Sequence, residues 1–218
     1  MCYKIFICCI LLFCLSCNPQ SRDDIPENPK LDQSKDAPNI LTNITPYTED
    51  GYVNAFIEIP AGTIDKWELN KSSGKLEWES VNGTPRKVNY LGYPGNYGMI
   101  PSTLLSKDSG GDGDPLDILV LGPATQRESI VKCKIIGVLY LSDQGERDDK
   151  LIAISQDSPM KDIHDMNQLE ANYNGVLDIV EIWFKNYKGR GFIKPKGYGS
   201  KTEALEILND AIEQFKAQ

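Results

Sequence analysis

Alternation between apolar and polar residues predicts a series of β-strands between residues 50 and 155. In Tyr52 to Ile59, apolar residues recur at every second position from Val53 and the run stops at Pro60, which predicts a strand. Two further runs flank the turn-forming stretch Asn70 to Gly74 and predict a β-hairpin. The predicted strands cover residues 52–59, 64–69, 75–79, 115–120, 130–141 and 151–154.

The C-terminal third changes to a helical period. Apolar residues recur at helical spacing from about residue 167 to 187, which predicts a helix that buries one stripe. Ser200 and Glu203 form a capping-box pattern at the start of a last amphipathic helix. Strands followed by helices favour an α+β fold, mainly β with α, in which helices pack outside a closed or strongly curved antiparallel sheet.

The stretch Gly110 to Gly122 carries the strongest chemical signal. Asp112, Asp114 and Asp117 lie within six residues, between a glycine run and a predicted buried strand. Carboxylates so close together repel one another, so the arrangement favours a bound cation. A plain surface turn is the alternative. An EF-hand calcium loop is excluded because Leu116 and Asp117 occupy positions where that loop needs an oxygen ligand and a glycine.

A second acidic turn spans Asp143 to Lys150 and adjoins the long strand 130–141. Metal ions held between the two acidic turns would explain both clusters. Cationic and hydroxyl side chains that could bind phosphate oxygens accompany them. These are Lys66, Arg86, Tyr97, Lys150, Tyr187 and Lys188. Carboxylates for metals combined with cations for phosphate oxygens suit phosphoryl transfer to water.

Composition excludes several other mechanisms. The single histidine, His164, lies in a loop-like context, so sites built on several imidazoles are excluded. The many carboxylates suit hard cations such as Mg²⁺. The net charge of −8, without a stripe rich in Lys and Arg, argues against a nucleic-acid partner.

The N-terminus has the pattern of an export signal. An apolar block, Ile5 to Leu15, is too short to cross a bilayer and precedes Cys17, so we expect a signal peptide over residues 1–16 and a lipid anchor on Cys17. Residues 17–45 are rich in Pro, Asn, Asp and Ser and predict a disordered tether. We therefore expect an exported protein, lipid-anchored to the bacterial cell envelope, with its domain over residues 46–218.

Cysteine usage allows no disulfide within that domain. Five of the six cysteines precede Asn18, which leaves Cys133 in an apolar stretch as a core residue.

The chain resembles the soluble family I inorganic pyrophosphatases. Asp112-Gly113-Asp114-Pro115-Leu116-Asp117 matches the signature of that family. Further matching motifs follow the family's order. They are Glu58-Ile59-Pro60, Lys66-Trp67-Glu68, Tyr93 with Asn96-Tyr97-Gly98, Asp143 through Lys150, and Tyr187-Lys188.

The resemblance implies a fold, a reaction and a set of roles. The fold would be an OB-like closed antiparallel β-barrel of about five strands with helices outside. The reaction would be Mg²⁺-dependent hydrolysis of pyrophosphate to two phosphates, with several ions per site and Mn²⁺ as a substitute. Metal ligands would be Asp112, Asp117, Asp143, Asp148 and Glu58. Asp114 would be the general base, and Glu68 and Tyr93 would support the site. The pyrophosphate would be held by Lys66, Arg86, Tyr97, Lys150, Tyr187 and Lys188.

Family relatives also form homo-oligomers, so the resemblance favours one here. The competing reading is a metal- or ligand-binding OB-like lipoprotein module without catalysis, because a fold does not fix a function. Such a module has no use for the ordered set of Lys, Arg and Tyr residues. Side activity on polyphosphate or nucleotides is left open by these residues.

Overall fold

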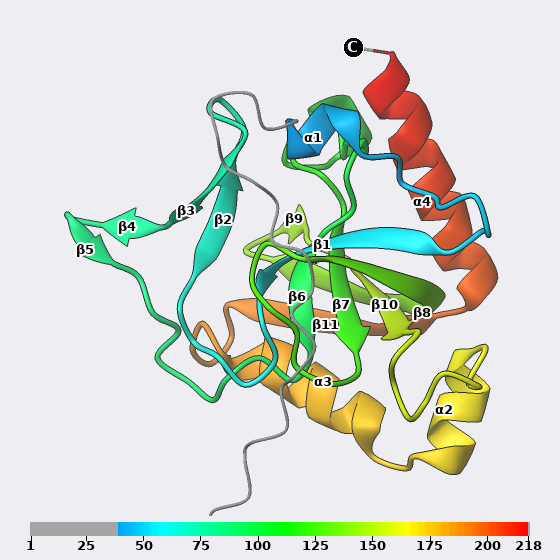
Figure 1. The fold of residues 1–218 in the computed structure, drawn as a ribbon. Helices are drawn as coiled ribbons and strands as arrows, with labels where there is room; N and C mark the ends of the chain where they lie inside the picture. The colour runs from blue at the N-terminus through cyan, green and yellow to red at the C-terminus, as the bar shows by residue number, and fades with distance from the viewer. Residues whose placement is uncertain (1–38, 218) are drawn as a thin grey trace, which may run out of the picture.

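The computed structural model describes residues 39–217, which fold around one sheet with two small hairpins and several helices (Figure 1). The sheet contains β1 (Val53–Ile59), β6 (Asn96–Met99), β7 (Asp117–Leu121), β8 (Ile130–Asp143), β9 (Glu146–Arg147), β10 (Lys150–Ser155) and β11 (Ile193–Gly199). The hairpins are β2 (Trp67–Asn70) with β3 (Lys75–Trp78), and β4 (Ser80–Val81) with β5 (Thr84–Pro85). The helices are α1 (Ile40–Asn43), α2 (Met166–Asn172), α3 (Val176–Asn186) and α4 (Lys201–Lys216), with a short 3-10 turn η1 (Lys107–Ser109). The prediction of a mixed α+β fold is confirmed.

Five strands pair in a ring, in the order β1, β6, β7, β10, β8 and back to β1. Pairing is antiparallel around the ring except between β7 and β10, which run parallel with Leu151 opposite Ile118. The prediction of a wholly antiparallel sheet was therefore wrong at this pair. The two strands are buried along almost their whole length, as continuous apolar runs in a parallel pair usually are.

The core lies on both faces of β7. Leu119 and Leu121 pack in the cluster beneath α2 and α3, whereas Ile118 and Val120 pack in the cluster beneath α4. Figure 1 shows α3 and α4 on different sides of the strands. Leu116 joins Ile118 and Val120, which confirms that these three side chains share one face of the strand. Apolar residues on both faces fix the strand that follows the acidic loop.

The predicted helix over 167–187 is two helices rather than one. α2 ends at Asn172 and α3 begins at Val176, with a break at the Asn174-Gly175 turn. Gly175 adopts a left-handed conformation (φ +83°), which favours glycine and interrupts the helix. The capping box of α4 is confirmed, because the Ser200 side chain accepts a hydrogen bond from the backbone N–H of Glu203 and the Glu203 side chain accepts one from the backbone N–H of Ser200.

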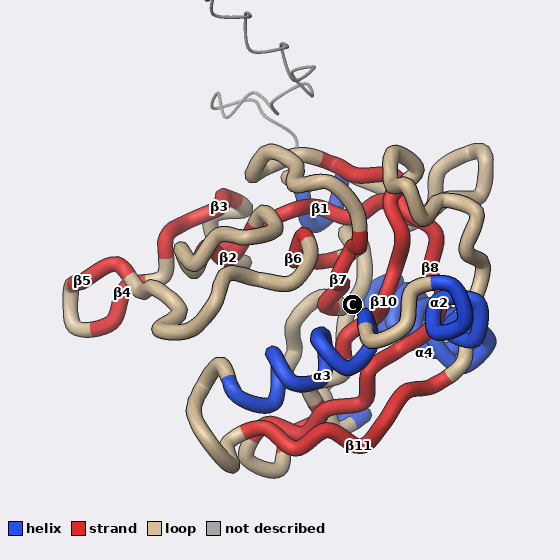
Figure 2. Tube along the Cα trace, turned by 90° about the horizontal axis from the view of Figure 1, so that it is seen from below, coloured by secondary structure: helices blue, strands red, loops and turns tan. Residues whose placement is uncertain are grey.

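The β2–β3 hairpin stands away from the ring, and β4–β5 projects further still (Figure 2). Trp67 and Trp78 are cross-strand partners and stack with ring centroids 5.4 Å apart. Such pairs stabilise a two-stranded ribbon that would otherwise be marginal. The predicted hairpin is confirmed.

The folded domain begins closer to the N-terminus than expected. Residues 39–45 were predicted to belong to the tether, but α1 lies here and its Ile40 is buried. The interpretation of this short stretch as disordered was wrong, because Ile40 finds an apolar pocket in the folded domain. The predicted signal peptide, Cys17 and most of the predicted tether lie outside the described residues. Between Asn39 and Ala217, no helix combines the length and apolar character needed to span a membrane.

Gly98 allows close pairing of β6 with β1. A methyl group added at Gly98 would lie 1.9 Å from the carbonyl oxygen of Phe56. We expect Gly98→Ala to lower the free energy of unfolding by at least about 4 kcal/mol in urea denaturation, because the two strands must separate. Gly83→Ala, in an open turn at φ +76°, should cost only about 1 kcal/mol. Equal losses for the two variants would contradict the steric argument.

Candidate active site

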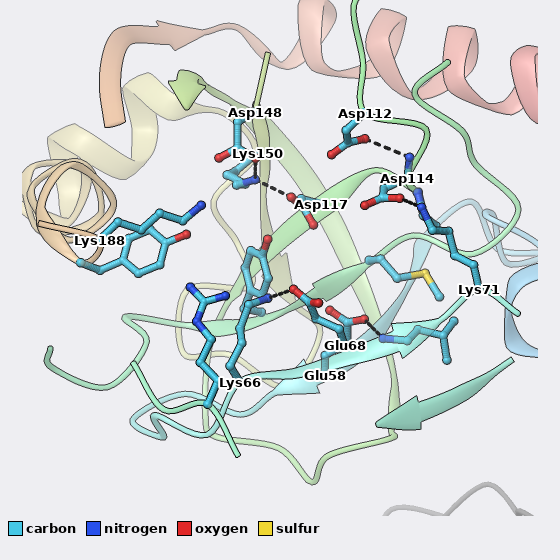
Figure 3. Close-up of a pocket in the computed structure, with 16 residues that line it drawn as sticks. Glu58, Lys66, Glu68, Lys71, Asp112, Asp114, Asp117, Asp148, Lys150 and Lys188 are labelled. Atoms are coloured by element: carbon cyan, nitrogen blue, oxygen red, sulfur yellow. Dashed lines mark hydrogen bonds and ion pairs between the residues drawn. The ribbon is translucent and has the colours of Figure 1, made fainter. Parts of the chain in front are cut away.

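One pocket of about 250 Å³ gathers most of the predicted functional side chains (Figure 3). Its acids are Glu58, Glu68, Asp112, Asp114, Asp117 and Asp148. Its cations are Lys66, Lys71, Arg86, Lys150 and Lys188. Tyr97, Tyr187, Leu69, Met99 and Pro115 complete the lining. The two acidic turns, far apart in sequence, therefore face one cavity together with the cations.

The first wall of the pocket is the β2–β3 hairpin with the end of β1. The backbone N–H of Leu69 donates to Glu58 Oε1 at 2.8 Å, which fastens the hairpin to β1. Lys66 lies immediately before β2, and its Nζ is 2.5 Å from Glu68. Burial raises the pKa of Glu58 to about 7, and attraction to Lys66 offsets this only in part.

The second wall is the acidic loop before β7. Asp112 Oδ1 accepts a hydrogen bond from the backbone N–H of Asp114 at 2.9 Å, and Gly113 between them adopts φ +86°. This local turn is typical of Asp followed by Gly. The Leu105 N–H donates to the backbone oxygen of Asp114 at 2.8 Å, which closes the loop. Burial, with repulsion from Asp117, raises the pKa of Asp112.

Lys150 lies at the centre of the acids. Its ammonium group is almost fully buried and contacts both Asp117 and Asp148, at 2.6 Å from Asp148 Oδ1. Burial disfavours the charged ammonium, but the two carboxylates outweigh it and raise the pKa of Lys150. Burial likewise raises the pKa of Asp148, despite its attraction to Lys150. Lys150 therefore stays charged and joins the two acidic turns.

Asp143 is beside the pocket rather than on its lining. Lys188 donates to its Oδ2, while Asp143 Oδ1 is buried without a hydrogen-bond partner in the described part of the chain. A buried carboxylate oxygen without a partner is unfavourable, so this oxygen is suited to coordinate a cation.

Aromatic rings support the tyrosines of the site. Tyr93 lies beneath the pocket, with its ring 5.1 Å from that of Tyr97 and 4.3 Å from that of Trp183. Trp183 also stacks on Tyr187 at 4.7 Å and is fixed by donating to the backbone oxygen of Leu91 at 2.9 Å. Burial raises the pKa of Tyr97 well above its usual range, so its hydroxyl stays protonated and can donate.

Arg86 reaches the pocket from the segment after β5. Its Nη1 lies 2.8 and 2.7 Å from the two oxygens of Glu79. Trp78 also holds this segment, donating from Nε1 to the backbone oxygen of Arg86 at 2.8 Å. Glu79 thus positions the predicted phosphate ligand.

Sequence reasoning missed Lys71 and Glu79. Lys71 lies in the hairpin turn, and its ammonium contacts the carboxylate of Asp114, the predicted base. The signal that could have found it is its place just past the Lys66 and Glu68 face of the same hairpin. Leu69, Met99 and Pro115 were missed as lining residues because apolar strand residues carry no distinct chemical signal.

The acids have the chemistry of a hard-cation site. Carboxylate oxygens converge from both turns, two of them with raised pKa values, and Asp143 offers a buried oxygen without a partner. Within residues 39–217, no three acid, His or Cys side chains cluster closely enough to form a ready-made metal site. Instead, lysine ammonium groups form ion pairs with the acids and neutralise part of their negative charge.

Comparison with known proteins gives a consistent assignment. The family model for inorganic pyrophosphatase matches residues 55–216. An inorganic pyrophosphatase of Xylella fastidiosa is 34% identical over 172 residues, which cover 75% of this chain and 89% of that protein. One from Helicobacter pylori is 36% identical over 170 residues, covering 73% and 89%.

Solved structures agree with the sequence matches. The inorganic pyrophosphatase of Helicobacter pylori superposes with a TM-score of 0.68 at 32% identity, covering 80% of this chain and 99% of that one. A truncated vacuolar soluble pyrophosphatase of Trypanosoma cruzi, solved with PPi, gives a TM-score of 0.79 over 83% of this chain and 79% of that one. At 24% identity the second match supports the fold alone. The chain belongs to the inorganic pyrophosphatase family.

Proposed function

We propose that this chain hydrolyses inorganic pyrophosphate to two orthophosphates with an activated water, and that its pocket binds Mg²⁺ for this purpose. The observation that carries the proposal is the meeting of both acidic turns with the Lys, Arg and Tyr set in one cavity. Membership of the family supports the same reaction. A binding module without catalysis would need no such combination.

Asp112, Asp117, Asp143 and Asp148 would hold the metal ions, with Glu58 as a further ligand. The fit rests on their oxygen-only chemistry and on the unpartnered Asp143 Oδ1. When bound, Mg²⁺ would supply positive charge that acidifies water and offsets charge on the phosphates. Mn²⁺ also accepts carboxylate oxygens and is the expected substitute.

Asp114 acts as the general base. Its side chain is 48% exposed, so water reaches the carboxylate, and its backbone is fixed by Asp112 and Leu105. The water oxygen forms a bond to one phosphorus as the bond from that phosphorus to the bridging oxygen breaks. Asp114 takes the proton of the water, and the bridging oxygen leaves with the second phosphate.

Four cations and two hydroxyls hold the substrate. Lys66, Arg86, Lys150 and Lys188, with Tyr97 and Tyr187, surround the cavity and can donate to phosphate oxygens. Glu68 supports them through its ion pair with Lys66, and Tyr93 does so by packing beneath Tyr97.

The proposal also includes a closed barrel and a homo-oligomer. The ring of five strand pairings supports an OB-like closed β-barrel. The exposed side chains of Ile179 and Ile182 on α3 support a homo-oligomer, because association would remove their apolar surface from water.

The apolar block before Cys17 supports export and a lipid anchor in the bacterial cell envelope. The polar segment after it would let the domain stand away from the membrane.

Removal of a central acid should abolish activity. Asp117→Asn should reduce Mg²⁺-dependent phosphate release from pyrophosphate at least about 100-fold, because it removes a ligand charge and one partner of Lys150. Chelation of the wild type should reduce release to a similar level. The exposed acid Asp162 provides the control, since Asp162→Asn should keep full activity. Wild-type release no faster than in chelator would refute the proposed reaction.

Glu79 should affect substrate binding through Arg86. We expect Glu79→Gln to raise the KM for pyrophosphate about threefold with little change in kcat, as the loss of a partly exposed ion pair is modest. Glu213→Gln, which removes an ion pair on α4, should leave KM unchanged. If Arg86→Gln impairs binding while Glu79→Gln does not, Glu79 has no positioning role.

The lipid anchor depends on Cys17. Cys17→Ser should move the protein from the membrane to the soluble fraction and remove the mass of the lipid, as seen by intact-mass spectrometry. Cys2→Ser, outside the apolar block, should change neither result. Membrane partitioning of Cys17→Ser equal to the wild type would disprove the anchor.

A further inference from the structure

The segment Asn39–Ile44 precedes the part of the chain that the family model matches, which begins at residue 55. We propose that this segment, the N-terminal brace, holds the two walls of the active-site pocket in register and that Ile40 is its main positioning residue. The inference rests on the proposed function for its kinetic effect. Figure 1 shows α1 at the same end of the molecule as the turn of the β2–β3 hairpin.

The brace contacts the hairpin wall through Ile40. This side chain is 5% exposed and packs in one cluster with Leu76 of β3, Phe56 of β1 and Met99 of β6. Leu69 packs on the edge of that cluster, and its backbone N–H donates to Glu58. Ile40 therefore lies behind the strands that carry the hairpin side of the pocket.

Asn39 places Ile40 and touches the hairpin turn. Its side-chain oxygen accepts from the backbone N–H of Leu41 at 3.0 Å and so caps the short helix. A Cβ added at Gly74, in the hairpin turn, would lie 3.1 Å from the same oxygen. The turn that carries Lys71 is thus in close contact with the brace.

The brace contacts the acidic wall through Ser102. The backbone N–H of Ser102 donates to the oxygen of Leu41 at 3.0 Å, and its hydroxyl donates to the oxygen of Ile44 at 2.8 Å. Ser102 adopts a left-handed conformation (φ +54°), which is unfavourable for a serine and is maintained by these bonds.

The next residues carry this contact to the acids. Thr103 Oγ1 accepts from the backbone N–H of Leu116 at 2.9 Å. Leu105 N–H donates to the oxygen of Asp114 at 2.8 Å. The loop held by the brace therefore fixes the backbone on which Asp114 and Asp117 stand.

Beyond the strand pairing of β1, β6 and β7, direct contact between the hairpin turn and the acidic loop is weaker. Lys71 crosses the pocket mouth to Asp114, but the two side chains are 54% and 48% exposed, and such ion pairs contribute little. Met99 lines the pocket and also packs in the cluster of Ile40. A loosened brace would let the walls drift apart, and this weakens binding of a substrate that both walls must grip.

The test compares Ile40→Ala with Leu208→Ala in the full chain. Leu208 is a fully buried residue of α4 and belongs to a different cluster, so its truncation costs stability while every contact of Ile40 stays in place. At a temperature where both variants are folded, Ile40→Ala should raise the KM for pyrophosphate about three- to tenfold with a smaller change in kcat. Ile40→Leu should restore KM, and Leu208→Ala should leave it near the wild-type value.

Hydrogen exchange provides the second measurement. Backbone amides of residues 67–78 and 112–117 should exchange at least about tenfold faster in Ile40→Ala than in Leu208→Ala. Unchanged exchange in both segments, or an equal rise in KM for the two variants, would contradict the proposed role of the N-terminal brace. If the wild type failed to release phosphate, the proposed function would fail, while the exchange data would still decide whether the brace exists.

Discussion

The neutralisation of crowded carboxylates by buried ammonium groups is the constraint on which the rest of the structure depends. Charged groups in a partly dry pocket are costly unless each has a partner. Lys150, with 2% of its side chain exposed, satisfies this need for Asp117 and Asp148 at once. The parallel pairing of β7 with β10 makes it possible, because Leu151 opposite Ile118 puts Lys150 and Asp117 side by side at the start of the two strands.

The remaining architecture positions other elements around this pair. β8 pairs with β1, β10 and β11, so one long strand sets the place of the second acidic turn relative to β1 and Glu58. The hairpin then closes the far side through Glu58 and Leu69. Helix α3 contributes Tyr187 by stacking Trp183 beneath it. Strands therefore place the acids, and the hairpin and α3 bring most of the phosphate-binding groups.

Local patterns predicted the strands, the hairpin and the capping box of α4 because each depends on neighbouring residues. Most of the pocket was predicted differently, from the resemblance to the family's motifs, because its residues lie far apart in the sequence. The parallel pair escaped prediction because it depends on which strands meet in space, which alternation does not encode. Lys71 and Glu79 escaped because their importance comes from contacts with Asp114 and Arg86, formed only after the hairpins fold.

The helix α1 also escaped prediction, because it too depends on contacts that form only in the folded chain. Four residues cannot form a stable helix alone, and the polar composition around Ile40 is that of a tether. Burial of Ile40 among Phe56, Leu76 and Met99 offsets the cost of ordering the turn. Composition averages over residues and therefore misses one apolar side chain that finds a partner.

The charge balance of the pocket explains why an acidic protein can act on an acidic substrate. Six carboxylates and five cationic groups line the cavity, so the lining alone has no surplus of positive charge. A pyrophosphate carries several negative charges and would meet net repulsion there unless further cations entered with it. Divalent metal ions would supply that charge, and the carboxylates would then serve as their ligands rather than as an obstacle to the substrate. The charge of the lining therefore agrees with the metal dependence that is general in this family.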